Sequence, residues 1–578
     1  MYDLRNKLLN KSFLQGNKIF ISLIFIVSLF RILIGVNIPI WLVIGSYYDD
    51  LLLLDYSHLI THFTDWNIIS LVKDLSYSIF LSFVRFSGLS YRFWISIMWI
   101  IAAVLMSYGI YRFLTKNKKV IFLAFLFILF LPMAFEVNFG LRIYRNAIQA
   151  PFTIIFLSTL YIFINYLFYF SNSKTKNVVL WAIILGFIFT FNYYIKEDGI
   201  LTLPIFLACI FGVLIYLIYT NYLKSFKRSD IRNIIKISII AILPIIIFAG
   251  CTVAYQEANY HYFGVHEINT RTSGEMGDFY SNLLKIDDDN KTTQVWIPAS
   301  TVEKAYNASP TLQKHPEFID AWMHTPWADG ILINSTIYGD LPTWSLRYAL
   351  NNSGLFSDEK SVNDMFYSVN KELDQAFENG SLKKSEKIFI TSSANGKDIG
   401  EISELSPFLV HGLRATLFFE KFKYGAIPDN GPTTVTDPSN NENYESDLND
   451  HLSVQKELDN PSFLEEFAKN FAMVDGIVYH LASYVIALLV FVSFIWLFYG
   501  GIKERFKNPE YNILLLFSIM AVGTLLVQIF AVSWFCAWLG FFHLRFYLPY
   551  SYGTYAVLAV LTIVGAYSLK FEKQKSDL

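Results

Sequence analysis

The chain has 578 residues, of which 54% are hydrophobic and only 16% are charged, and its formal net charge is −2. Soluble globular proteins average about 25% charged residues. The composition therefore excludes an ordinary soluble domain and indicates a polytopic membrane protein, with the lipid bilayer and no nucleic acid as a partner. The three cysteines lie in or beside apolar runs, so we expect neither a disulfide framework nor a zinc site.

Ten apolar segments predict membrane-spanning helices, since a helix needs about 20 residues to cross a bilayer. They are residues 19–44, 93–112, 120–136, 148–170, 179–194, 200–220, 235–255, 478–500, 511–534 and 545–568. The third and fifth are short. The first is longer than a signal-peptide core and has no obvious cleavage site after it, so we interpret it as a retained span.

Lysine and arginine in the short connections predict the orientation of these spans. The N-terminus is basic, and so are RFLTKNKK, SNSKTKN, KSFKRSDIRNIIK, GIKERFKNPE and the C-terminal KFEKQKSDL. Every second connection is therefore expected on the cytoplasmic side, which predicts a multi-pass protein of the cell membrane with both termini inside. The other connections are expected to face outward, and they are residues 45–92, 137–147, 195–199, 256–477 and 535–544.

The connection 256–477 is long, polar and acid-rich, and it predicts a folded extracytoplasmic domain of mixed α/β character. The chain then divides into residues 1–255 with seven spans, this domain, and residues 478–578 with three spans and a short tail. The amphipathic stretch SELSPFLVHGLRATLFFEKFKY fits either a helix on the membrane surface or a core helix of the domain. The aromatic residues of the domain either stack on sugars or, more often, form its core, and they include Trp296, Trp322, Trp327, Tyr338 and Trp344.

The first outward connection contains two apolar segments with charges at short intervals, LLLLDYSHLITHF and IISLVKDLSYSIFLSFVRFSG. They predict two amphipathic helices along the outer interface and not two further spans. His58 and His62 have an i, i+4 spacing that suits zinc. Since no third ligand is in view, we favour a surface histidine pair.

Asp49 and Asp50 directly follow the first span and directly precede the four leucines 51–54. An acidic residue at a span end commonly marks the point where the chain leaves the bilayer and enters water. Here the apolar segment that follows holds the pair close to the lipid surface, where a carboxylate is costly unless it has partners or a task.

Cations accompany this acidic pair on the outward side, where the bias of Lys and Arg toward the cytoplasm does not predict them. They are Lys73, Arg142, Arg145, Lys196 and Arg545. Such a set suits an anionic group at the membrane surface, and a lipid phosphate is the obvious one. Other candidate site residues beside these cations are Asp74, Glu136, Glu197 and His543.

This order of features resembles the glycosyltransferase C (GT-C) superfamily. The residues that carry the resemblance are the acidic pair after one span, VKDLSYS at the start of the second interfacial segment, and HLRFYLP at the entrance to a late span. The resemblance covers residues 1–255 and 478–568 but not 256–477. Two features depart from the mannosyltransferase-like members: leucines 51–54 replace an aromatic residue, and the HPPL element is absent.

The resemblance implies transfer of a sugar from a polyprenyl-phosphate carrier to an extracytoplasmic acceptor, which is a cell-surface glycopolymer, a glycolipid or a protein. It assigns the base to Asp49, with Asp50 as substitute or orienting partner. It assigns the donor phosphate to Arg545 first, and then to Arg142, Arg145, Lys196 and Lys73. Direct attack by the acceptor inverts the anomeric centre.

Two neighbouring carboxylates are expected to raise each other's pKa, which would make one of the two a better base. No cofactor is expected, and no divalent metal, because the acidic metal motif of oligosaccharyltransferases in the second outer loop is reduced here to Glu136.

Two other classes stay open. A transporter or flippase for lipid-linked saccharides would favour mid-span charges and inverted repeats, whereas Arg31 is one of few such charges here and no repeat is evident. A polysaccharide polymerase or ligase of another fold also has a large outer loop, but it does not depend on an acidic pair after the first span. The abundance of Ile, Asn and Lys suggests an AT-rich bacterial genome.

Overall fold

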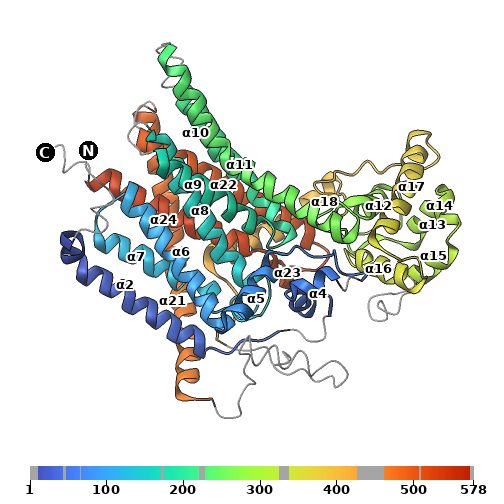
Figure 1. The fold of residues 1–578 in the computed structure, drawn as a ribbon, viewed down its shortest axis with the longest axis horizontal. Helices are drawn as coiled ribbons and strands as arrows, with labels where there is room; N and C mark the ends of the chain where they lie inside the picture. The colour runs from blue at the N-terminus through green and yellow to red at the C-terminus, as the bar shows by residue number, and fades with distance from the viewer. Residues whose placement is uncertain are drawn as a thin grey trace.

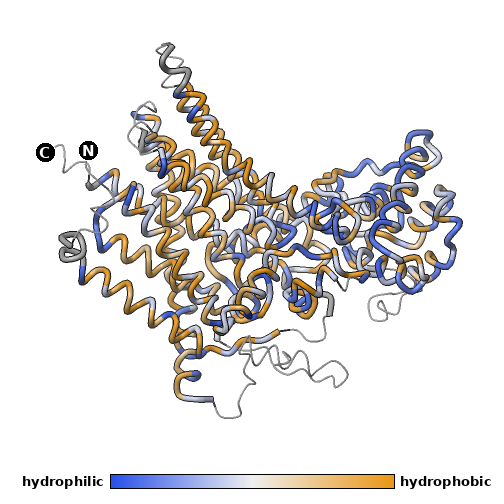
Figure 2. The backbone as a smooth tube through the Cα atoms, viewed as in Figure 1, coloured by the Kyte–Doolittle hydropathy of each residue, from blue (hydrophilic) through white to orange (hydrophobic). Residues whose placement is uncertain are grey.

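A computed structural model of the chain describes residues 11–42, 47–64, 67–170, 175–219, 228–324, 337–425, 461–504, 506 and 509–572. A bundle of long helices forms the larger part, and a cluster of shorter helices lies beside one end of it (Figure 1). The long helices are mostly hydrophobic, whereas the smaller cluster is largely hydrophilic (Figure 2).

Nine helices within the described residues are long and apolar enough to cross a membrane. They lie in α2 (Lys11–Asn37), α6 (Tyr91–Phe113), α8 (Asn146–Phe168), α9 (Thr175–Tyr193), η4 with α10 (Glu197–Thr202 and Leu203–Ile218), α11 (Arg228–Phe263), α21 (Phe463–Lys503), α22 (Pro509–Cys536) and α24 (Pro549–Tyr567). The expectation of a polytopic helical membrane protein is confirmed.

The predicted third span, 120–136, is where the structure differs from the ten expected spans. Helix α7 (Lys118–Leu129) has only 12 residues, which is about 18 Å of helix. It ends before Pro132, which cannot continue a helix, and the 3-10 turn η2 (Pro132–Ala134) follows. The segment still joins the two ends of the bundle. Asn117 Nδ2 donates to Tyr567 Oη over 3.0 Å at one end, and Val137 N donates to Lys423 O over 3.0 Å at the other.

The centre of the bundle is formed by α8 and α24, whose span-like windows are 94% and 89% buried. Close approach of the two backbones requires a residue without a side chain. A Cβ placed on Gly553 of α24 would stand 2.9 Å from the Ala150 carbonyl oxygen of α8. Small residues at such contacts are typical of helix packing in membranes.

The first outward connection folds into short helices that cannot cross a bilayer. It begins with a π-helical turn, η1 (Tyr47–Leu51), and continues with α3 (Leu52–Tyr56), α4 (Leu59–Thr64) and α5 (Ser76–Ser87). Helices of 5, 6 and 12 residues reach less than about 20 Å. Leu52 and Tyr56 of α3 pack with Val72 and Leu75 of the loop before α5, and Trp344 of the smaller cluster joins them.

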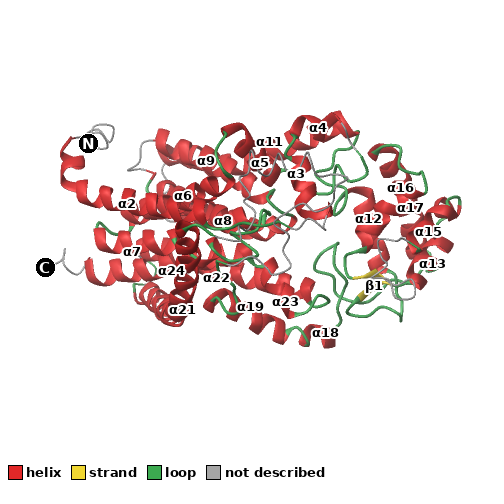
Figure 3. Ribbon diagram, turned by 90° about the horizontal axis from the view of Figure 1, so that it is seen from below, coloured by secondary structure: helices red, strands yellow, loops and turns green. Residues whose placement is uncertain are grey.

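The smaller cluster is helical, so the expectation of a mixed α/β domain is wrong for the described residues. Its helices are α12 (Gly274–Lys285), α13 (Ala299–Ala308), α14 (Pro310–Gln313), α15 (Pro316–Met323), α16 (Pro342–Asn352), α17 (Glu359–Glu378) and α18 (Ile399–Ser403). Only β1 (Val295–Ile297) and β2 (Ile337–Tyr338) pair there as strands, in an antiparallel two-stranded sheet (Figure 3).

The longest helix of this cluster shows why the segment is helical. The side chain of Asp358 caps the N-terminus of α17 by accepting from Ser361 N over 2.6 Å. The buried residues Val362, Phe366, Val369 and Leu373 then recur every three or four positions, which is the helical period.

The amphipathic stretch after this cluster becomes α19 (Ser406–Phe418), which packs against α21 and α22 of the bundle. A Cβ on its Gly412 would stand 2.9 Å from Ile529 of α22. The boundaries drawn at 255 and 477 fall inside continuous helices, because α11 extends to Phe263 and α21 begins at Phe463. Both helices therefore extend past the predicted ends of the spans.

Candidate functional site

The five connections predicted to face outward meet at one end of the bundle. Each contributes residues to a single large cavity of about 620 Å³, for example Asp49, Arg145, Lys196, Arg271 and Trp538. This gathering of distant segments makes the end of the bundle the candidate active site.

Asp49 and Asp50 are adjacent in η1 but have different surroundings. The Asp49 side chain is 41% exposed, and its exposed surface faces cavities. The Asp50 side chain is fully buried. Its Oδ2 accepts from Arg142 Nε over 2.9 Å and its Oδ1 accepts from Arg142 Nη2 over 2.6 Å. Asp49 can therefore reach a ligand, whereas Asp50 is committed to Arg142.

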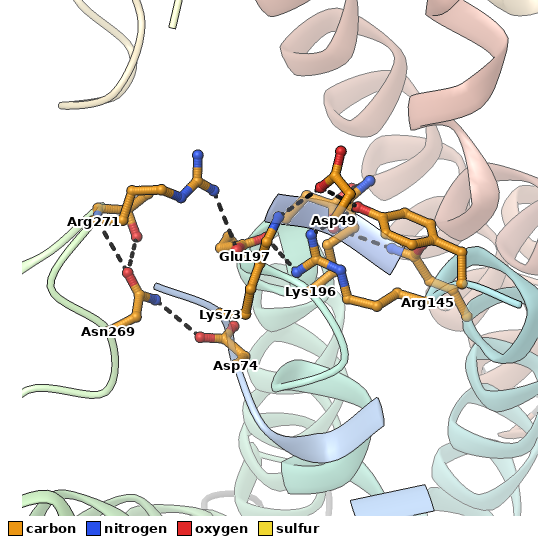
Figure 4. A network of polar contacts seen from close by, with 12 residues as sticks. Asp49, Lys73, Asp74, Arg145, Lys196, Glu197, Asn269 and Arg271 are labelled. Carbon is orange, nitrogen blue, oxygen red and sulfur yellow. Dashed lines mark hydrogen bonds and ion pairs between the residues drawn. The ribbon is translucent and has the colours of Figure 1, made fainter. Parts of the chain in front are cut away.

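Lys73 provides the direct partner of Asp49. Its Nζ donates to Asp49 Oδ1 over 2.8 Å, and it also stands 4.9 Å from the ring centroid of Trp344. Tyr144 Oη makes a longer contact with the same Asp49 oxygen, at 3.4 Å. Figure 4 shows Asp49 between Lys73 and Arg145 in this network.

The cations determine the ionisation of Asp49. Burial alone would raise the pKa of Asp49, but Lys73, Arg142 and Arg145 outweigh it and hold this pKa well below its usual range. The expectation of a raised pKa is wrong for Asp49, because the charges of these cations dominate its pKa. Burial also lowers the pKa of Lys73 to about 8, although Asp49 opposes the change.

Glu197 joins two arginines from different parts of the chain (Figure 4). Its Oε2 accepts from Arg145 Nη1 over 2.8 Å and its Oε1 accepts from Arg271 Nη2 over 3.2 Å. Arg145 also donates to Tyr144 Oη over 3.0 Å, and Arg271 lies 3.8 Å from Asp340. The arginines are thus fixed in place, and their Nε atoms have no hydrogen-bond partner.

Lys196 is the buried cation most available to a ligand. Its side chain is 6% exposed and lines the large cavity. Its Nζ has no hydrogen-bond partner, because the nearest carboxylate, Asp198, lies 3.6 Å away. The Tyr547 ring supports the ammonium at 4.6 Å from its centroid. The ion pair of Lys196 with Asp198 is longer than a hydrogen bond, so an anion in the cavity would supply the hydrogen bond that the buried ammonium lacks.

The large cavity has two kinds of lining. Its charged part contains four cations and four carboxylates: Lys73, Arg145, Lys196 and Arg271, and Asp49, Glu197, Asp198 and Asp340. Its apolar part is formed by the site ends of two spans: Ile200 and Leu201 from η4, and Ala531, Val532 and Phe535 from α22. A molecule with a phosphate head and a hydrocarbon tail suits such a lining.

A second cavity of about 330 Å³ also has Asp49 in its lining. Arg142, Arg545, His543 and Glu136 line it. Burial raises the pKa of Glu136 to about 7, although the backbone bonds from residues 138 and 423 and the charge of Arg545 oppose the change. Of the five predicted phosphate-binding cations, three line the large cavity and two, Arg142 and Arg545, line this one.

Asp74 is near the site but does not line either cavity. It is 4% exposed and accepts from Asn269 Nδ2 over 2.9 Å. Burial raises its pKa to about 7, and Glu197 adds to the effect. Asp74 therefore attaches the loop of Lys73 to the segment that carries Arg271.

Sequence reasoning missed two charged site residues from the connection 256–477, namely Arg271 and Asp340. Arg271 stands in the polar stretch NTRTSG, where nothing distinguishes it from a surface arginine. Of the aromatic candidates for sugar stacking, Trp296 and Trp322 are core residues. Trp344 alone lines the large cavity, and Trp327 lies outside the described residues.

The described part of the chain contains no group of three or more His, Cys, Asp or Glu side chains that could hold a metal ion. His62 is buried among the rings of Tyr56, Phe63 and Phe263, and burial lowers its pKa to about 4. His58 instead contacts Arg85 Nη1 over 2.9 Å. The two imidazoles thus have separate partners.

The arrangement can bind an anionic head group beside a carboxylate, with apolar surface adjacent for a tail. Comparison with protein-family models, with curated proteins and with solved structures finds no match to this chain.

Proposed function

We propose that the protein is a membrane glycosyltransferase of the GT-C type, which transfers a sugar from a polyprenyl-phosphate carrier to an extracytoplasmic acceptor. The observation that carries the proposal is the position of Asp49. This carboxylate lines a cavity whose lining combines buried cations with apolar surface from the ends of two spans. The active end of the bundle would face away from the cytoplasm.

In the proposed reaction the acceptor hydroxyl oxygen attacks the anomeric carbon of the donor. The bond between that carbon and the phosphate oxygen breaks, and its electron pair leaves with the lipid phosphate. Lys196, Lys73 and the arginines that Glu197 holds would stabilise the charge that develops on this phosphate. Asp49 takes the proton of the hydroxyl and later releases it to water.

The ion pair between Lys73 and Asp49 gives the donor a second role. A bound phosphate offers Lys73 another anion, so the ammonium would share its hydrogen bonds between the two groups. Asp49 then loses part of the interaction that lowers its pKa and becomes a stronger base. Donor binding would in this way prepare the base before the acceptor attacks.

The test is transfer of radiolabelled sugar by the purified full chain in nanodiscs. The donors are synthetic polyprenyl-phosphate sugars with different head groups, and the acceptor is a cell-envelope extract. The wild-type protein should move label from at least one donor into the extract, and Asp49→Asn should not. Failure with every donor, or an Asn variant as active as the wild type, would refute the proposal.

The same purified protein, reconstituted into liposomes, separates this reaction from transport. A flippase for lipid-linked saccharides would move the labelled lipid between the leaflets of liposomes and leave the label on the lipid. A glycosyltransferase would release free polyprenyl phosphate and form a new glycosidic bond. Accumulation of polyprenyl phosphate that depends on Asp49 is therefore the decisive product.

A further inference from the structure

The second cavity differs from the large one in its lining. Among the described residues its lining has no aliphatic side chain: four of its walls are the rings of Phe139, Phe422, Phe546 and Tyr547, and the rest are charged or polar groups. The large cavity has the aliphatic surface that a lipid tail requires. A polar ligand of ring shape suits the smaller cavity, and its 330 Å³ lies at the low end of the range for small-molecule sites.

Asp49, Phe546 and Tyr547 line both cavities. A ligand in either cavity can therefore contact Asp49, and two ligands could meet there. If the donor phosphate occupies the large cavity with its buried cations, the group that attacks needs a separate approach to Asp49. The smaller cavity provides that approach.

The two arginines of the second cavity have defined neighbours. Arg142 donates from Nε and Nη2 to the two oxygens of Asp50. Arg545 stands 5.8 Å from the Phe422 ring centroid, and its charge acts on Glu136 across the same cavity. An arginine and a carboxyl group in one aromatic-walled cavity suit neighbouring hydroxyl groups, which donate to one and accept from the other.

The walls of this cavity are rigid. The Phe422 ring packs edge-to-face on Tyr552 at 5.5 Å and on Phe139 at 5.9 Å. The backbone beside Glu136 pairs with the segment that carries Phe422, through Val137 N to Lys423 O at 3.0 Å. The exposed face of an aromatic ring attracts the C–H groups of a sugar ring, because that face carries partial negative charge.

We infer that the second cavity binds the acceptor as a saccharide, with Glu136 and Arg545 as acceptor-binding residues, so that Arg545 does not bind the donor phosphate. This inference rests on the proposed function. It reverses the role that the family resemblance gives to Arg545. Glu136 and Arg545 hold neighbouring hydroxyl groups of the acceptor sugar, and Asp49 receives the proton of the hydroxyl that attacks.

The experiment compares two probes on the full chain in nanodiscs. Undecaprenyl phosphate reports on the large cavity through its dissociation constant. Methyl glycosides of glucose, galactose, mannose and N-acetylglucosamine report on the second cavity through saturation-transfer NMR. The variants are Glu136→Gln and Arg545→Gln in the second cavity, Lys196→Gln in the large cavity, and Arg414→Gln on an exposed surface as the matched control.

We expect Lys196→Gln to weaken undecaprenyl phosphate binding about tenfold or more, as expected for loss of a charged hydrogen bond, and to leave the glycoside signals unchanged. Glu136→Gln and Arg545→Gln should abolish the signal of at least one methyl glycoside and change phosphate binding less than about twofold. If Arg545→Gln unfolds the protein, Arg545→Lys, which keeps the charge, replaces it in the experiment. This variant should also leave phosphate binding unchanged.

The inference is overturned if Arg545→Gln weakens phosphate binding as much as Lys196→Gln does. It is also overturned if no methyl glycoside gives a signal with the wild-type protein, or if the signals survive both substitutions in the second cavity. Failure of the wild-type protein to bind undecaprenyl phosphate would instead count against the proposed function, and the glycoside spectra would still be read separately.

Discussion

At the scale of single residues, the two neighbouring aspartates have different tasks. Asp49 lines both cavities, so Asp49→Asn removes the proposed base but keeps the shape of the side chain. We expect turnover to fall about 10²- to 10⁴-fold, which is the usual contribution of a general base. Undecaprenyl phosphate binding and the thermal unfolding temperature should stay close to those of the wild type. A variant with wild-type turnover would remove Asp49 from the chemistry.

Asp50→Asn should behave in the opposite way and act on stability. The substitution leaves the guanidinium of Arg142, whose side chain is 11% exposed, without its charge partner. Breaking a buried pair by removal of one partner costs about 3–5 kcal/mol. The measurement is the thermal unfolding temperature in detergent.

The matched control for Asp50 is the double variant Asp50→Asn with Arg142→Gln, which removes both charges. It should recover part of the lost stability, because no uncompensated charge stays buried. If Asp50→Asn unfolds at the wild-type temperature, the pair does not have the structural role that its burial indicates.

Lys73 predicts a pH dependence of donor binding. The pKa of Lys73 is lowered to about 8, so the side chain is cationic below this pH and neutral above it. We expect binding of undecaprenyl phosphate to weaken as the pH rises through about 8. A bound phosphate favours the charged form, so binding near this pH should take up a proton, which calorimetry in buffers of different ionisation enthalpy detects.

Lys73→Arg is the control for this titration, because arginine stays charged at any relevant pH. The variant should bind undecaprenyl phosphate with little change of affinity across the same pH range. An unchanged midpoint near pH 8 in the arginine variant would assign the titration to another group.

At the scale of elements, the loop that carries Lys73 is held by the smaller helical cluster. Thr270 N donates to Leu71 O over 2.7 Å. Arg347 of α16 donates to Ile68 O and to Thr270 Oγ1, and it pairs with Glu359 of α17 over 3.0 Å. The cluster therefore positions Lys73 although it contributes no residue to that loop.

Arg347→Gln should release this loop. Its partner Glu359 has a side chain that is only 2% exposed, so the lost pair also destabilises the cluster. We expect faster amide exchange in residues 67–75 and lower turnover, measured by hydrogen exchange with mass spectrometry and by sugar transfer. Arg414→Gln, which removes an exposed arginine of an ion pair, is the control and should change neither. Unchanged amide exchange in residues 67–75 would contradict this role of Arg347.

At the scale of the whole molecule, the arrangement predicts one orientation in the membrane. The connections that form the site gather at one end of the bundle, and the basic connections predict that the other end is cytoplasmic. A reporter fused at Lys116 should therefore read inside. A reporter inserted at Gly380, in the turn after α17, should read outside. Readings from the same side would refute the topology, since the chain crosses between these positions.

The sequence by itself determined the apolar helices, the basic side of the protein and the acidic pair at the site. These follow from local composition, because about 20 apolar residues in a row leave the chain few options besides a span. It did not determine α7 or the character of the smaller cluster. Pro132 shortens one span, and amphipathic helices build a cluster that polarity alone suggested to be mixed.

Only the tertiary structure decided which charges meet. Asp49 and Asp50 are equivalent in the sequence, yet Lys73 approaches one and Arg142 encloses the other. Arg271 joins the site through Glu197, across 74 positions of the chain. Such pairs depend on where the ends of the spans are packed together, and a cation has no preferred carboxylate until the fold brings one within a few ångströms. The division of the site into two cavities, with Arg545 in one and Lys196 in the other, likewise depends on that packing.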